Sequence, residues 1–234
     1  MRGFGQFCPI AKTLEIIGTR WTPLILRELL AGGRHFSDIQ QGVPLISRSL
    51  LAQRLKELEQ DGLITATEKP NGRGHEYTLT RAGAAVRPIL EALSDWGVHH
   101  AQDHIRPEDC DPWMLFLGIR RHCDLDPLPD RRFVIRFELS NVPASRRGVT
   151  TWWLVWDDAE LDVCVTNPGF QVDVVVRSPI DVLVKVWMGH FGLAEATASG
   201  AICLDGGAAA RKILIAMFGF KREPDPKTFQ IAFS

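Results

Sequence analysis

Several features that would assign a function directly are missing from this 234-residue sequence. No apolar run approaches the roughly 20 residues that a membrane-spanning helix needs, and the first ten residues hold no hydrophobic segment of a secretion signal. The five cysteines are odd in number and scattered, with no C-x-x-C pair, which argues against a disulfide framework. These absences favour a cytoplasmic protein with reduced thiols and no membrane partner.

The sequence patterns of common catalytic sites are also missing. The chain has no G-x-S-x-G motif, no glycine-rich phosphate loop and no carboxylate pair in a distinctive context. His100 and His104 lie four residues apart near Asp103, a spacing that can bind a transition metal, but a polar, solvated helix end is the favoured interpretation. The sequence therefore predicts no enzyme, no cofactor and no metal site.

Net charge is close to zero, at −1, but the charges are unevenly placed. Between Arg20 and Lys56 six residues are basic and two are acidic. A local positive balance of this kind suits a surface that docks on a polyanion. Nucleic acid is therefore a partner that the sequence favours.

The pattern of the first hundred residues predicts short helices followed by a hairpin. Helices are expected over 8–18, 19–33 and 35–44, the second with Thr19 as its N-cap. Ser47 is expected to cap a longer helix that stops at Gly62. Strands at 63–69 and 75–80 flank Asn71-Gly72, a strong turn signal, and a helix kinked at Pro88 runs from Thr80 to His104.

The helix that follows Ser47 has two distinct faces. At 100° per residue its leucines share one side, and the other side carries the small, polar and cationic residues Arg48, Ser49, Ala52, Gln53 and Lys56. Arg48 and Gln53 have the hydrogen-bonding groups that base edges in the major groove require, and Lys56 can reach a phosphate. Arg54 falls on the apolar side and is interpreted as an ion-pair partner of Glu28 or Asp61.

Residues 36–41, a tight connection and this helix form a predicted helix-turn-helix, and the hairpin is interpreted as its wing. The wing tip is basic and kept thin by glycine, which suits a phosphate backbone or a minor groove; a solvated basic turn is the alternative. The candidate DNA contacts are Arg34, Ser47, Arg48, Ser49, Gln53, Lys56, Lys69, Arg73 and His75. One recognition helix contacts only a half-site, so we expect a homodimer on a pseudo-palindromic operator in double-stranded DNA.

Several motifs occur in order along residues 8–97: Cys8-Pro9, "GTRW" at 18–21, "RHFSDI" at 34–39, "ISRSLLAQRLKELEQDGLI" at 46–64, "EYTLTRAG" at 76–83 and Trp96-Gly97. Through these motifs the segment resembles the HxlR-type winged-helix transcription regulators. The resemblance implies a homodimeric DNA-binding repressor or activator whose dimer is built from the terminal helices. In some members a cysteine near the N-terminus senses oxidants, and Cys8, with Lys12 one turn on, matches that position; a small buried residue is the alternative.

From residue 131 the pattern changes. Runs at 132–140, 150–158, 160–166, 171–178 and 201–207 are strand-like, and 179–189, 193–200 and 208–220 look helical. This half resembles sterol-carrier-protein lipid-binding domains through "WWLVW" at 152–156, "DVCVTNPGFQVDVVV" at 162–176, "VWMG" at 186–189 and "ATASGAICLDG" at 196–206. The resemblance implies one curved sheet with helices over one face and an apolar tunnel between them; a tunnel closed by side chains is the alternative.

The expected fold class is α+β: a winged helix-turn-helix followed by an α/β sterol-carrier-like domain. Residues 1–106 are predicted to bind DNA and dimerise, 107–130 to form a linker, and 131–234 to bind a small apolar effector that modulates DNA binding. The expected effector pocket comprises Trp152, Leu154, Trp156, Val174, Trp187, Met188, Phe191, Leu214, Met217 and Phe218. These residues can instead simply form the core, and a lipid carrier or small acyl-processing enzyme is the alternative function.

Overall fold

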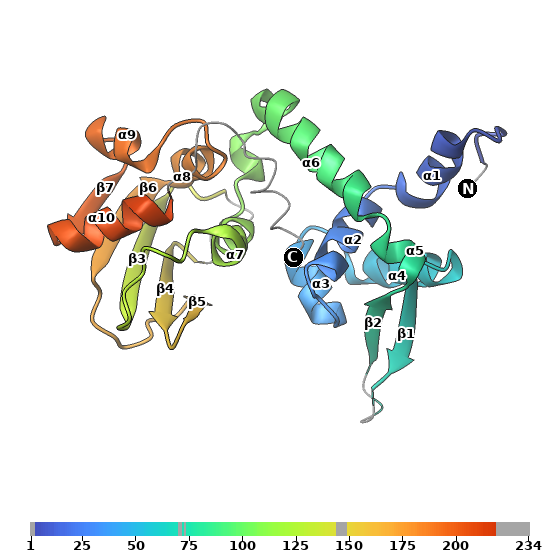
Figure 1. Ribbon diagram of the computed structural model, residues 1–234, viewed down its shortest axis with the longest axis horizontal. Coiled ribbons are helices and arrows are strands. Elements are labelled where there is room, and N and C mark those ends of the chain that lie inside the picture. Colours follow the sequence, from blue (N-terminus) through green and yellow to red (C-terminus); the bar gives the residue numbers. More distant parts are fainter. Residues whose placement is uncertain (1–2, 70–71, 73, 144–148, 219–234) are drawn as a thin grey trace. The chain divides into compact units, whose positions relative to one another are not determined.

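The computed structural model describes residues 3–69, 72, 74–143 and 149–218 (Figure 1). The chain divides into two compact units, and the division falls between Gly97 and Val98, inside α6 (Arg87–His100). The sequence predicts this division further along, near Arg106. In the described part of the chain no helix is long and apolar enough to cross a membrane.

The first unit contains the helices and the hairpin that the sequence predicts. Helices α1 (Pro9–Ile17), α2 (Thr22–Leu30), α3 (Phe36–Gly42) and α4 (Arg48–Gln60) precede the antiparallel strands β1 (Ile64–Glu68) and β2 (His75–Leu79). Their shared core is a cluster of buried aliphatic side chains from α2, α3, α4 and β1, among them Ile25, Leu26, Ile39, Leu51, Leu55 and Ile64.

The start of α2 differs from the prediction. The helix begins at Thr22, with Trp21 rather than Thr19 as its N-cap. Pro23 lies in the first turn, where the missing N–H has no intrahelical partner to lose, so the sequence favours this later start. The hydroxyls of Thr19 and Thr22 are hydrogen-bonded to each other at 2.6 Å.

The helix predicted from Thr80 to His104 is divided. Thr80 caps a short helix, α5 (Arg81–Ala84), by accepting a hydrogen bond from the Gly83 amide, and α6 begins at Arg87. A continuous helix would bring the ring of Pro88 against the carbonyl of Ala84 and would lose one N–H donor. The proline therefore ends one helix and lies in the first turn of the next.

The second unit is built on a five-stranded sheet (Figure 1). Its strands are β3 (Phe133–Ser140), β4 (Thr151–Asp157), β5 (Glu160–Cys164), β6 (Val174–Pro179) and β7 (Cys203–Gly206), in the order β5-β4-β3-β6-β7. Neighbouring strands are antiparallel except β3 and β6, which are parallel. Helices α8 (Ile180–Trp187), α9 (Leu193–Ala198) and α10 (Ala208–Met217) follow β6 and β7, at the positions that the sequence predicts.

The segment 107–130, which the sequence predicts as a linker, contains a helix of the second unit. This helix, α7 (Pro112–His122), buries Leu115, Phe116 and Ile119 in the core of that unit. The Phe116 ring stacks on the ring of Trp152, with 4.7 Å between the centroids. The linker prediction is corrected here, because it relied on the acidic, proline-containing start of the segment and overlooked the apolar spacing that follows.

Alternation along the strands divides the sheet into two faces. One face, which includes Ile135 and Leu154, is buried in a single cluster with apolar residues of α7, α8, α9 and α10. The other face includes Val134 and Trp153, which belong to a separate, smaller cluster. The four helices therefore pack on one face of the sheet.

Candidate nucleic-acid interface

Helices α3 and α4 and the connection between them form the helix-turn-helix. Ser47 caps α4 as predicted, since its hydroxyl accepts a hydrogen bond from the Leu50 amide at 3.2 Å. Leu51, Leu55 and Leu58 are at most 2% exposed, so one side of α4 is fixed in the core. The opposite side is exposed and carries the predicted contacts Arg48, Ser49, Gln53 and Lys56.

The Arg48 side chain is supported by an aromatic ring of the preceding helix. Its guanidinium carbon lies 5.2 Å from the centre of the Phe36 ring, within range of a cation–π contact. Phe36 is half-buried and packs against the core of the first unit. The guanidinium thus rests on a fixed surface and keeps its N–H groups available for hydrogen bonding at the start of α4.

Three polar side chains of α4 form a hydrogen-bonded chain. Gln53 donates from Nε2 to Oε1 of Glu57 at 2.9 Å, and Arg54 donates from Nη1 to Oε2 of the same carboxylate at 2.5 Å. These hydrogen bonds, first from Gln53 and then from Arg54, hold the pKa of Glu57 below its usual value. The structure thus pairs Arg54 with Glu57, a residue of its own helix, whereas the sequence prediction named Glu28 and Asp61.

The hairpin of β1 and β2 forms the wing. Its register pairs Ile64 with Leu79 and Glu68 with His75, so the strands are matched to their ends. Beyond the ladder, the Lys69 amide donates to the Gly74 carbonyl at 3.0 Å, and Gly74 has a φ of +90°, a conformation that favours glycine. Lys69 and His75 lie at this end of the wing, and Arg73 lies outside the described residues.

The wing is joined to the helix-turn-helix through the residues before α3. The Tyr77 amide of β2 donates to the Arg34 carbonyl at 2.8 Å, and the Arg34 guanidinium forms an ion pair with Glu76 at 3.2 Å. These contacts link the two parts that would contact DNA. Arg34 is a predicted DNA contact, but its partner Glu76 was not predictable, because residues 42 positions apart carry no local pattern that joins them.

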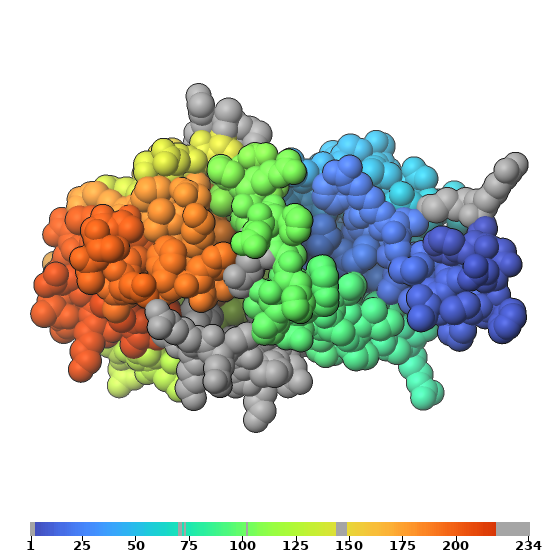
Figure 2. Space-filling model, turned by 90° about the horizontal axis from the view of Figure 1, so that it is seen from above, coloured from blue at the N-terminus to red at the C-terminus, as the bar shows by residue number. Residues whose placement is uncertain are grey.

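Helix α1, the residue Phe7 just before it, and helix α6 expose apolar side chains. Phe7, Ile10 and Leu14 are 98%, 70% and 47% exposed, and Ile89, Leu93 and Trp96 are 39%, 54% and 60% exposed. In Figure 2, α1 (dark blue) and α6 (green) lie on the face of the molecule turned toward the viewer. Exposed apolar stripes of this size are typical of surfaces that another protein covers.

Two further candidate sites from the sequence are the thiol of Cys8 and the histidine pair His100 and His104. Cys8 is half-buried at the N-cap of α1, and Lys12 forms an ion pair with Glu15 at 2.9 Å. The lysine that the sequence placed beside the thiol therefore has an acidic partner of its own. Within the described ranges, no group of three or more potential metal ligands gathers, at His100 and His104 or elsewhere.

The ten predicted effector residues belong to the second unit. Six are buried, four are half-buried, and several are in ring contact with other core residues. The Trp187 and Phe218 rings, for example, meet edge to face with 6.0 Å between centroids. The half-buried residues are Trp156, Trp187, Met188 and Phe191.

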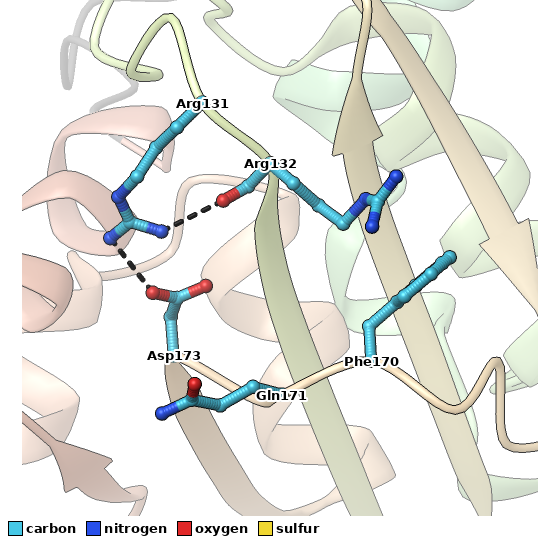
Figure 3. A pocket seen from close by; sticks show the side chains of 5 residues that line it. All are labelled: Arg131, Arg132, Phe170, Gln171 and Asp173. Atoms are coloured by element: carbon cyan, nitrogen blue, oxygen red, sulfur yellow. Dashed lines mark hydrogen bonds and ion pairs between the residues drawn. The ribbon is translucent and has the colours of Figure 1, made fainter.

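A polar hollow that the sequence analysis missed lies elsewhere in the second unit (Figure 3). It measures about 410 Å³ and is lined by Arg131, Arg132, Phe170, Gln171 and Asp173, none of them among the predicted effector residues. Arg131 forms an ion pair with Asp173 at 2.8 Å, and the guanidinium carbon of Arg132 lies 3.9 Å from the centre of the Phe170 ring. Arg132 also pairs with Asp157, so both arginine charges are compensated.

Comparison with known proteins covers the first unit. The sequence profile described as HxlR-like helix-turn-helix matches residues 16–105. The HTH-type transcriptional regulator YvaP of Bacillus subtilis (strain 168) is 39% identical over 93 residues, which are 39% of this chain and 86% of YvaP. YtfH of Escherichia coli (strain K12), also an HTH-type transcriptional regulator, is 38% identical over 94 residues, 40% of this chain and 75% of YtfH. The reduced form of the transcriptional regulator YodB from B. subtilis is 31% identical, covers 42% of this chain and 98% of its own, and has a TM-score of 0.36.

Proposed function

This chain belongs to the HxlR-like helix-turn-helix family and is a DNA-binding transcription regulator; on that premise we propose that it binds a pseudo-palindromic operator as a homodimer through α4. The observation that carries this proposal is the two-sided character of α4. Its leucines are fixed in the core, while Arg48, Gln53 and Lys56 are exposed on the other side. A helix held in this way can present the same side chains to the major groove each time it binds.

Arg48, Gln53 and Lys56 of α4 each have a distinct proposed role. Arg48, whose guanidinium rests on Phe36, contacts the O6 and N7 acceptors of a guanine. Gln53 contacts a second base, and Lys56 contacts a phosphate, which positions the helix without selecting a sequence. The hydroxyl of Ser47 is used in capping α4, so its proposed contribution is to hold the N-terminus of the helix toward the phosphate backbone.

The homodimer is proposed from the apolar stripes on α1 and α6. A single α4 contacts only one half-site, so tight and specific binding requires two copies. Covering Phe7, Ile10, Leu93 and Trp96 in a symmetric contact would remove a large apolar surface from water. An operator-bound dimer that overlaps a promoter blocks transcription sterically, and repression is therefore the mode that we propose.

Substitutions on α4 test the proposed contacts. Arg48→Ala should weaken binding to the operator by about 1–3 kcal/mol and relax the preference for one base pair. Lys56→Ala should weaken binding to all sequences equally and reduce the dependence of log K on log salt by about one unit. Fluorescence anisotropy at several salt concentrations measures both effects. Operator binding by both variants with wild-type affinity would rule out α4 as the recognition helix.

For the second unit we propose a small apolar effector whose binding changes the affinity for DNA. The resemblance to sterol-carrier domains and the apolar face shared by the sheet and its four helices support this role. Because six of the ten expected pocket residues are already buried, the ligand would enter by displacing the half-buried ones, such as Trp187 and Phe191. For regulation it is sufficient that the effector binds one arrangement of the dimer more tightly than another by about 1–3 kcal/mol.

The effector proposal is tested with fatty acids, sterols and aromatic compounds as probes. A binding probe should raise the melting temperature and change operator affinity in the wild-type chain. Phe191→Arg, at a half-buried position, should abolish both responses and leave DNA binding without the probe intact. Thermal shifts that are absent across the whole panel would contradict the proposal. Lipid binding by a chain with neither sequence preference nor salt-dependent DNA binding would favour the carrier alternative.

A further inference from the structure

The amide of Gln53 is held in place before any DNA arrives. Its Nε2 donates to Oε1 of Glu57, and Oε2 of that carboxylate accepts from Arg54. The Arg54 side chain is only 14% exposed, so the far end of this chain of hydrogen bonds is anchored close to the core. Glu57 therefore connects an exposed amide with a nearly buried guanidinium, and the orientation of the amide follows from that connection.

The hydrogen-bonding groups of the Gln53 amide that Glu57 does not use match one base. Its nitrogen carries two hydrogens, and Glu57 uses one, which leaves one N–H donor and the Oε1 acceptor. In the major groove adenine offers the complementary pair, an N6 donor and an N7 acceptor. Guanine offers two acceptors, N7 and O6, so the amide oxygen would face another oxygen and repel it.

The positions of Gln53 and Arg48 on α4 separate their contacts. Gln53 follows Arg48 by five residues, which places it about 7.5 Å further along the helix axis and about 140° around it. The adenine contacted by Gln53 is therefore expected to be a different base from the guanine contacted by Arg48 within each half-site.

We propose that Glu57 is a positioning residue that holds the Gln53 amide for adenine and thereby sets the specificity of one operator position. The inference rests on the proposed function, in which α4 lies in the major groove. Glu57 has a second consequence, because its negative charge lies on a helix that approaches phosphates. It weakens binding to DNA of any sequence while it sharpens the choice at one base pair.

The test uses the full chain, a selected operator duplex and the same duplex with each base pair substituted singly. For the wild type we expect about tenfold weaker binding when one A·T pair is changed to G·C. Glu57→Ala should reduce that discrimination to about twofold or less, and should bind unrelated DNA more tightly than the wild type. Gln53→Ala should also lose the discrimination, and the double variant should lose no more than Gln53→Ala alone.

Two control variants separate orientation from charge and from helix stability. Glu57→Gln keeps an acceptor oxygen for Gln53 and should retain the discrimination, although it too binds unrelated DNA more tightly. Asp61→Asn removes a negative charge at the C-terminal end of the same helix and should leave the discrimination unchanged.

Wild-type discrimination in Glu57→Ala overturns the inference and leaves the proposed function in place. Wild-type discrimination in Gln53→Ala overturns the inference and also the base contact proposed for Gln53, while recognition through Arg48 would stand. A wild-type chain that binds every duplex equally overturns both.

Discussion

Replacing Trp96 with aspartate separates dimerisation from folding. Trp96 is 60% exposed, and a tryptophan side chain presents about 250 Å² of surface, so about 150 Å² is open to solvent. At about 25 cal/mol per Å², its complete burial in a symmetric contact stabilises the dimer by about 4 kcal/mol per protomer. Even with partial burial, Trp96→Asp should raise the dimer dissociation constant at least about 100-fold, since it also brings two charges into the contact.

Analytical ultracentrifugation over a range of concentrations measures this change. Trp96→Phe is the matched control, because it keeps an aromatic surface and should remain a dimer. Both variants should keep the wild-type far-ultraviolet circular dichroism, since the side chain is mostly outside the core of the unit. Trp96→Asp should lose operator affinity together with dimerisation, whereas Trp96→Phe should keep both. A Trp96→Asp chain that sediments as a dimer at the same concentrations as the wild type would refute the assignment of α6 to the interface.

Two further predictions concern stability. Gly42→Ala should destabilise the first unit by about 1–3 kcal/mol in thermal melts, because the Cβ of the new alanine would lie 2.0 Å from Cδ of the fully buried Glu28. Gly97→Ala is the comparison variant: Gly97 lies in open space within α6, so an alanine there should instead stabilise the unit by about 0.5–1 kcal/mol. Burial lowers the pKa of His122 from 6.5 to about 4, so the folded chain binds fewer protons than the unfolded chain between these values and loses stability as pH falls through them. Because His122 is partly solvent-accessible, the loss of unfolding free energy between pH 7.5 and pH 4.5 should be about 1–2 kcal/mol in the wild type. Urea unfolding at these two pH values should show a smaller loss in His122→Gln. The same loss in the wild type and the variant would contradict the lowered pKa of His122.

The parts of the first unit that were predictable are those with local causes. The leucine spacing of α4, its Ser47 cap and the pairing of β1 with β2 each involve residues close in sequence, and helical or strand periodicity identifies them. The predicted Asn71-Gly72 turn falls partly outside the described residues. The contact of Arg48 with Phe36, the ion pair of Arg34 with Glu76 and the orientation of Gln53 are not visible in that pattern. They depend on which neighbouring elements meet and on which partner a side chain finds.

The second unit illustrates the same limit. Its strands and three of its helices follow from alternation and turn residues, whereas α7 was overlooked because polar and proline residues precede it. The polar hollow brings Arg131 and Arg132 beside Phe170 and Asp173, about forty residues further along, and only the parallel pairing of β3 with β6 makes them neighbours. The apolar residues proposed for an effector pocket were identified by strand alternation, helical position and the resemblance to sterol-carrier domains, which do not distinguish a packed core from a cavity.

The most direct test of the central claim is a selection of binding sites from random double-stranded DNA with the purified full chain. The account predicts an enriched inverted repeat whose half-sites lie about one helical turn apart, or a multiple of it, and the same selection with Arg48→Ala should lose a guanine from each half-site. Selected duplexes should bind more weakly as salt rises. Enrichment of no sequence, or an identical enriched sequence with Arg48→Ala, would contradict the claim that α4 recognises the operator.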